Sequence, residues 1–241
     1  MLAKRFESVG WHLPDEFNFP EFKLQLEKLL NRNRLFKGSW INLIIIPVYP
    51  STELDFGPSF KCIGLTEEIE YDYFPLNIKG ISIGISEKYH NTADPFYSSM
   101  VRNPLRNLMI SQEAAMNGWD EIILTDQNGY LSETTGSNIF IKIKDQIFTP
   151  SPVNHGFPRM VTGIVKSLIP KTDCSLVISE KMKPDQLNKA DEIFLTDDQY
   201  GIRWVLGFDK KRYYRKISSV LHEELSELIR TTDQFQPGSS G

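Results

Sequence analysis

Residues 118–140 read GWDEIILTDQNGYLSETTGSNIF, and this stretch is the most informative about fold class. Two runs of strand-forming residues, 121–126 and 130–133, flank a Gln-Asn-Gly turn, which is the pattern of a tight hairpin. Two more runs, 138–143 and 147–150, follow on either side of a Lys-Asp-Gln turn. The stretch therefore predicts a meander of short strands.

A helix is predicted immediately before this meander. Asn103 is a favourable N-cap residue, Pro104 suits the first helical position, and Asn117–Gly118 is typical of a helix end. Leu105 and Leu108 provide apolar side chains between these two boundaries. Both ends of the helix are therefore marked in the sequence.

The remainder of the chain mixes helices and strands irregularly. Phe22, Leu26 and Leu30 form an apolar stripe that predicts an amphipathic helix after Pro20, and residues 49–58 are rich in loop-forming residues. Further strands are predicted at 40–46, 78–85, 174–179, 192–196 and 203–206, and further helices at 160–168, 184–190 and 219–230. This order favours an α+β fold over a regular parallel βαβ arrangement.

Composition and charge exclude several classes of function. The 241 residues include 27 Lys+Arg and 31 Asp+Glu, a balance of -4 that offers no basic footprint for nucleic acid. Cys62 and Cys174 lie far apart and show neither a disulfide framework nor the spacing of zinc ligands. The apolar run Ile41–Val48 is much shorter than the ~20 residues of a membrane helix, and the first residues lack the apolar run of a signal peptide. We expect a cytoplasmic protein with no nucleic-acid or membrane partner.

Local motifs alone do not identify a function. The sequence has no GxGxxG after a strand, no GxxxxGK[ST], no HExxH and no GxSxG. Its four histidines are isolated from one another, which indicates surface or core residues rather than ligands. No metal site is predicted.

Several segments taken in order do identify a family. Residues 118–129, 132–140, 147–150 and 190–196, in this order and spacing, resemble the pyridoxal-phosphate (PLP) enzymes of aminotransferase class IV. This family includes branched-chain and D-amino-acid aminotransferases and aminodeoxychorismate lyase, and the resemblance covers about residues 20–230. It implies a two-part α+β fold, PLP as cofactor, a small amino-acid-like ligand and a homodimer.

The resemblance also implies how the chain is divided. We expect a smaller N-terminal part at 1–85, a larger part at 86–232 and a flexible tail at 233–241, with the cofactor cleft between the two parts. Family members begin with strands and an element whose arginine grips the phosphate. Met1 corresponds to about the end of that element. The N-terminal part is therefore expected to be short and to lack that arginine.

Glu133 matches the carboxylate that the family places against the PLP ring nitrogen. PLP acts as an electron sink only while this nitrogen stays protonated, which requires a fixed carboxylate partner. The alternative is a solvated glutamate at a strand end. Asn138 resembles the family's asparagine that braces the same turn.

The family's Schiff-base lysine has no counterpart at the matching position. In the family it lies three or four residues before an asparagine that opens a helix ending in Glu-Ala, and Asn103 and Glu113–Ala114 match those landmarks. Counting back gives Met100 or, if the spacing is four, Ser99. Neither side chain can form the Schiff base or shuttle its proton.

The phosphate-binding turns differ from the family's pattern as well. The stretch that matches a Gly-Ile-Thr-Arg-like turn begins at Arg159 and continues with Met160 and Val161, and the second phosphate loop contains Asp197 and Asp198. A carboxylate beside a phosphate is repelled. We hypothesise that Arg159 and Asp198 pair where the family holds the phosphate; the alternative is two unrelated surface substitutions.

Three functions remain open at this point. The first is a class IV protein with altered PLP loops and impaired or non-conventional PLP chemistry, which keeps the fold and uses the cleft for another ligand or partner. The second is an active PLP-dependent aminotransferase or aminodeoxychorismate lyase. A third, weaker possibility is an enzyme that uses the pyridoxamine form with Tyr97 or His155 as base.

Overall fold

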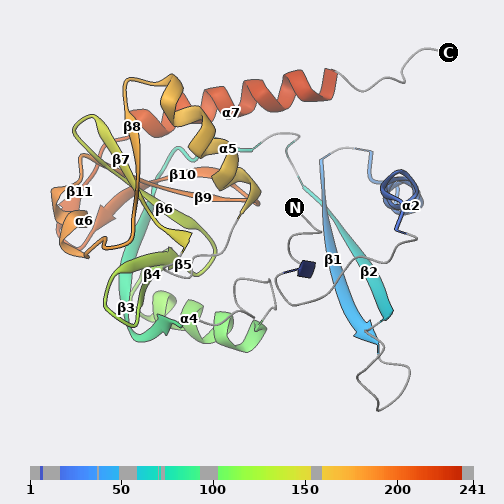
Figure 1. Cartoon of the computed structure of the whole chain (residues 1–241), viewed down its shortest axis with the longest axis horizontal. Helices are drawn as coiled ribbons and strands as arrows, with labels where there is room; N and C mark the ends of the chain where they lie inside the picture. The colour runs from blue at the N-terminus through green and yellow to red at the C-terminus, as the bar shows by residue number, and fades with distance from the viewer. Residues whose placement is uncertain are drawn as a thin grey trace. The chain divides into compact units, whose positions relative to one another are not determined.

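The computed structural model separates into two compact units, Met1–Tyr73 and Phe74–Gly241 (Figure 1). The residues that the structure describes are 6–7, 17–36, 38–48, 59–69, 71, 74–92, 103–152 and 159–234. Within this part of the chain, no helix is long and apolar enough to cross a membrane.

The described part of the first unit contains the helical residues 6–7, one longer helix and a two-stranded antiparallel sheet. Helix α2 (Phe19–Arg32) is capped by Asn18, whose side chain accepts the N–H of Glu21 at 3.2 Å. Strand β1 (Ser39–Val48) pairs with β2 (Ser59–Glu68) over their whole lengths. The expected helix and first strand are confirmed, whereas β2 was not expected because its polar residues interrupt the apolar pattern.

The second unit is built on one mixed, curled sheet of nine strands. The strand order is β5-β4-β3-β10-β9-β6-β7-β8, with β11 paired to β10. The strands are β3 (Ile81–Asn91), β4 (Glu121–Asp126), β5 (Leu131–Thr134), β6 (Asn138–Ile143), β7 (Gln146–Pro150), β8 (Ser175–Ser179), β9 (Glu192–Asp197), β10 (Gly201–Phe208) and β11 (Lys211–Arg212). Because β3 pairs with β4 and β10, it belongs wholly to this unit, although the expected division at residue 85 lies within it.

Both faces of this sheet are buried. Along β6, Ile139 and Ile141 belong to one apolar cluster, whereas Phe140 between them belongs to another. Alternate side chains of a strand point to opposite faces, so the two clusters lie on opposite sides of the sheet. Phe140 stacks on its cross-strand partner Phe194 with 4.9 Å between ring centroids. The continuous apolar runs seen in the sequence thus reflect strands that are covered on both sides.

Three helices cover the same face of the sheet at its different ends, because Ile122 and Leu124 of β4 pack with α4 whereas Ile123 between them belongs to the cluster of Ile139 and Ile141. Helices α5 (Met160–Leu168) and α7 (Ile217–Gln234) pack together and on β9 and β10, and α4 (Pro104–Met116) packs on β3 and β4 (Figure 1). As expected, Asn103 caps α4 by accepting the N–H of Arg106 at 3.0 Å. Gly118, at φ +71°, follows the end of α4 in a conformation that favours glycine.

Two short helical segments and the last helix complete the unit. The segments are the 3₁₀ turn Ile169–Lys171 and α6 (Asp185–Lys189). Helix α7 extends to Gln234, into the segment expected to be a tail. The α+β fold class predicted from the sequence is confirmed.

Candidate functional site

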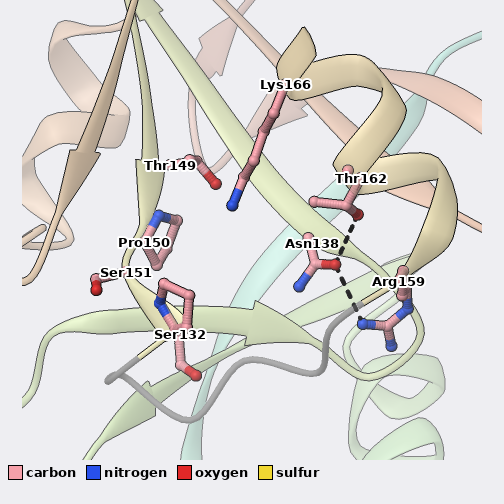
Figure 2. A pocket seen from close by; sticks show the side chains of 10 residues that line it. Ser132, Asn138, Thr149, Pro150, Ser151, Arg159, Thr162 and Lys166 are labelled. Atoms are coloured by element: carbon pink, nitrogen blue, oxygen red, sulfur yellow. Dashed lines mark hydrogen bonds between the residues drawn. The ribbon is translucent and has the colours of Figure 1, made fainter. Parts of the chain in front are cut away.

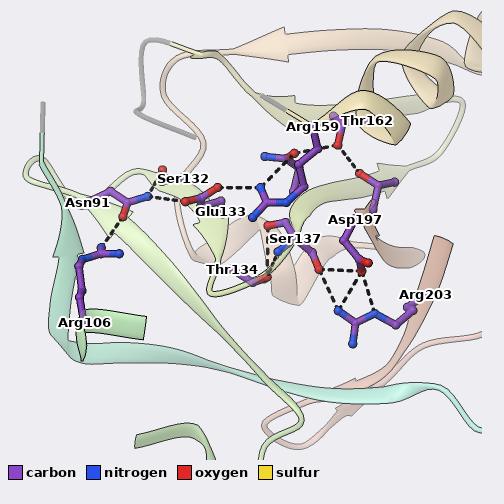
Figure 3. A network of polar contacts seen from close by, with 12 residues as sticks. Asn91, Arg106, Ser132, Glu133, Thr134, Ser137, Arg159, Thr162, Asp197 and Arg203 are labelled. Carbon is purple, nitrogen blue, oxygen red and sulfur yellow. Dashed lines mark hydrogen bonds and ion pairs between the residues drawn. The ribbon is translucent and has the colours of Figure 1, made fainter. Parts of the chain in front are cut away.

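Glu133 is the centre of the candidate site. It lies in β5 opposite Leu124 of β4 and is fully buried. Arg159 Nη1 donates to Glu133 Oε2 at 3.1 Å, and Asn91 Nδ2 donates to Glu133 Oε1 at 3.3 Å (Figure 3). The Arg159 side chain is itself only 10% exposed. A carboxylate that is removed from water needs a countercharge, and Arg159 supplies it.

The Glu133–Arg159 ion pair is the middle of a longer chain of hydrogen bonds. On one side, Arg106 Nη2 of α4 donates to Asn91 Oδ1 of β3 at 2.7 Å. On the other side, Arg159 Nη1 also lies 3.5 Å from Asn138 Oδ1 of β6. These contacts connect α4, β3, β5, β6 and the residue before α5 (Figure 3). The positions of both charged side chains are therefore supported by several elements.

Asp198 caps the N-terminus of α5. Its Oδ1 atom accepts the backbone N–H of Val161 at 2.9 Å. The first N–H groups of a helix lack partners within the helix and favour negative charge, so this carboxylate is well placed. The hypothesised Arg159–Asp198 pair is therefore wrong: Arg159 pairs with Glu133 instead. The buried Glu133 carboxylate needs the guanidinium, whereas the half-buried Asp198 carboxylate is held by a backbone amide.

Asp197 closes the turn between β9 and β10. Its carboxylate accepts the backbone N–H groups of residues 199 and 200 at 2.8 and 2.6 Å and the hydroxyl of Ser137 at 3.1 Å. It also pairs with Arg203, which contacts Glu121 as well. Burial alone lowers the pKa of Arg203, but the Glu121 and Asp197 carboxylates outweigh burial and raise this pKa above its ordinary value.

A pocket of about 160 Å³ lies beside the ion pair (Figure 2). Among the described residues, those that line it are Ser132, Asn138, Thr149, Pro150, Ser151, Pro152, Arg159, Thr162, Gly163 and Lys166. The pocket is therefore bounded by β5, β6, the end of β7 and one side of α5.

The residues expected to contact a cofactor take different positions. Met160 is 56% exposed, whereas the Val161 side chain is fully buried in the apolar cluster between α5 and the sheet. Val161 therefore offers only its backbone to the site. The expected residues that lie outside the described part of the chain are Ser99, Met100, Tyr97 and His155.

Sequence reasoning missed two parts of this site. It identified Glu133 and Arg159 separately but not their contact, and it did not identify Lys166 at all. Arg159 stands where the family pattern has glycine, and this unexpected charge was a signal that could have pointed to the ion pair. Nothing in the sequence indicates that Lys166 turns toward a pocket.

The sequence profile of the family described as Amino-transferase class IV matches residues 7–205. A probable branched-chain-amino-acid aminotransferase from Aquifex aeolicus is 32% identical over 111 residues, which are 45% of this chain and 35% of that protein. The chain thus matches only about a third of the length of this relative, and 52% of a relative from Methanocaldococcus jannaschii.

Solved structures share the fold. The crystal structure of a putative 4-amino-4-deoxychorismate lyase from Legionella pneumophila superposes with a TM-score of 0.78 at 20% identity, covering 98% of this chain and 83% of that chain. The branched-chain aminotransferase from Thermobaculum terrenum in its PLP form superposes with a TM-score of 0.78 at 18% identity, covering 96% of this chain and 78% of that chain. With the profile match, these findings show that the chain belongs to the class IV aminotransferase family and has the fold of its PLP enzymes.

Proposed function

We propose that this chain is a class IV protein that does not carry out conventional PLP-dependent transamination and that binds a small amino-acid-like ligand. The Glu133–Arg159 ion pair is the observation that carries the proposal. By the family resemblance, Glu133 is the carboxylate that would hold the protonated ring nitrogen of PLP. Here the Arg159 guanidinium already neutralises this carboxylate at 3.1 Å.

The N-terminus of α5 supports the same conclusion. In the family this helix end would meet the PLP phosphate through its backbone N–H groups. Here Val161 N–H donates to Asp198 Oδ1. A phosphate beside the Asp198 carboxylate would face a repulsion of about 1–4 kcal/mol at close range. The residues present therefore do not fit PLP at either its ring nitrogen or its phosphate.

The position of the Schiff-base lysine gives a third, independent argument from the sequence. Met100 or Ser99 stands there, according to the spacing. A thioether or an unactivated hydroxyl cannot replace an amine that must condense with an aldehyde and then move a proton. Covalent anchorage and proton transfer would thus both be missing.

Incubation with PLP followed by borohydride reduction and intact-mass measurement tests this proposal. The wild-type chain is expected to show no reduced PLP adduct. Met100→Lys alone, or Ser99→Lys for the longer spacing, should remain poorly labelled because Arg159 and Asp198 are still present. Combining either lysine with Arg159→Gly and Asp198→Ser should restore labelling in protein that thermal unfolding shows to be folded. A stoichiometric adduct on the wild-type chain would refute the proposal, and peptide mapping would locate the lysine.

The second candidate function is an active PLP-dependent aminotransferase or aminodeoxychorismate lyase. Two observations favour it: Glu133 is retained in β5, and a protein of the same fold was crystallised in its PLP form. The test is turnover of branched-chain amino acids with 2-oxoglutarate, and of aminodeoxychorismate, in the presence of PLP. Turnover that is lost in Glu133→Ala would favour this candidate.

A further inference from the structure

Lys166 places an ammonium group in the pocket beside the ion pair. It lies one turn after Thr162 on α5, and Figure 2 shows its side chain extending between Thr149 and Asn138. No residue in the described part of the chain forms a hydrogen bond or ion pair with its Nζ atom. Burial lowers the pKa of Lys166 below 10.5, which indicates a partly desolvated cation.

Asn138 directs a second donor into the same pocket. Its Oδ1 atom lies 3.5 Å from Arg159 Nη1 and accepts the Thr162 hydroxyl at 2.7 Å. Because a guanidinium only donates, this contact fixes the orientation of the Asn138 amide and leaves Nδ2 for the pocket. Figure 2 shows Nδ2 on the pocket side of Asn138.

The charge of the pocket favours an anion. Among the described residues that line it, Lys166 and Arg159 are cations and none is a carboxylate. Arg159 is compensated by Glu133, which leaves the Lys166 charge without a described counterion. A cation held away from water gains most from a ligand that brings a negative charge.

The size and the remaining walls limit the rest of the ligand. The volume of about 160 Å³ is well below the roughly 300–1,000 Å³ of pockets for drug-sized ligands. The rings of Pro150 and Pro152 provide apolar surface. The pocket thus offers two polar donors on one side and apolar wall on another.

We propose that this pocket binds a small molecule with one carboxylate group, which accepts from Lys166 Nζ and Asn138 Nδ2 while its apolar body lies against Pro150 and Pro152. The inference rests on the ligand-binding part of the proposed function and deepens it, because it names a carboxylate ligand and a site that does not include the matched lysine position. The two proposals are tested with different ligands, so either can fail alone.

Isothermal titration calorimetry of the full chain with butyrate, butyramide and inorganic phosphate tests the inference. Butyrate should bind with a stoichiometry of one per chain. Butyramide, which lacks the charge, and phosphate, which lacks the apolar body, should each bind at least tenfold more weakly. Phosphate binding in preference to butyrate would overturn the inference, as would equal binding of butyrate and butyramide or the absence of any binding.

Variants show whether Lys166 is responsible. Lys166→Met should weaken butyrate binding at least tenfold, and Lys166→Arg should retain part of it because the charge remains. Lys171→Met is the matched control, since it removes the same charge from an exposed residue near the same helix. Thermal unfolding of each variant checks folding. Wild-type affinity in a folded Lys166→Met would overturn the inference.

Discussion

Replacing Arg159 by methionine is expected to destabilise the chain strongly, because it removes the cation that pairs with the fully buried Glu133 carboxylate. Methionine keeps an unbranched side chain but removes the charge. At the 3.1 Å separation and an effective dielectric constant of about 20, the attraction between Glu133 and Arg159 is about 5 kcal/mol. Breaking a buried pair from one side costs about 3–5 kcal/mol, which is the loss in unfolding free energy that we expect.

The assay is urea unfolding with linear extrapolation, applied to Arg159→Met, Glu133→Gln and the double variant. The double variant removes both charges and should recover part of the loss, giving a coupling energy of about 2–4 kcal/mol. Lys171→Met, at an exposed position, should stay within about 0.5 kcal/mol of the wild type. A loss below about 1 kcal/mol for Arg159→Met, or no coupling, would refute the reasoning.

Three further predictions concern other parts of the molecule. The buried Glu192 carboxylate accepts the backbone N–H groups of residues 216–218 at the start of α7. Glu192→Ala should therefore lower the unfolding free energy measured in urea by about 2–4 kcal/mol. A loss under about 1 kcal/mol would contradict this. Burial lowers the pKa of His222 below 6.5 in the folded chain, so the unfolded chain binds this proton more readily. The unfolding free energy is therefore highest above about pH 6.5, where His222 is neutral, and it decreases as the pH falls below that value. His222→Gln should flatten this slope in unfolding measurements between about pH 8 and about pH 5, and an unchanged slope would count against it. The family resemblance predicts a homodimer, and sedimentation equilibrium should give twice the chain mass; a monomer at all concentrations would exclude it.

The helices and the central strands could be predicted because their signals are local. Helix α5 begins at Met160 and ends at Leu168 as expected, because Val161, Val165 and Leu168 form an apolar stripe at helical spacing. Strands β4 and β6 were evident as apolar runs bounded by turns. Strand β2 was not evident, since Lys61 and Gly64 interrupt its pattern and its pairing with β1 is a long-range contact.

The site could be predicted only as a set of residues. Glu133 and Arg159 are 26 positions apart, and their contact depends on how β5 meets the N-terminus of α5. The hypothesis drawn from the sequence paired Arg159 with Asp198 instead, because the sequence carries no information about which carboxylate is desolvated. In the same way, the amphipathic pattern of α5 identifies its buried stripe but not that Lys166 extends into a pocket.

A crystal structure of the wild-type chain grown with PLP tests most directly whether Arg159 has taken the cofactor's place on Glu133. We predict that the Glu133 Oε2 to Arg159 Nη1 contact remains, with no pyridine nitrogen bonded to the carboxylate. A pyridine ring within hydrogen-bond distance of Glu133, with Arg159 displaced, would contradict this prediction.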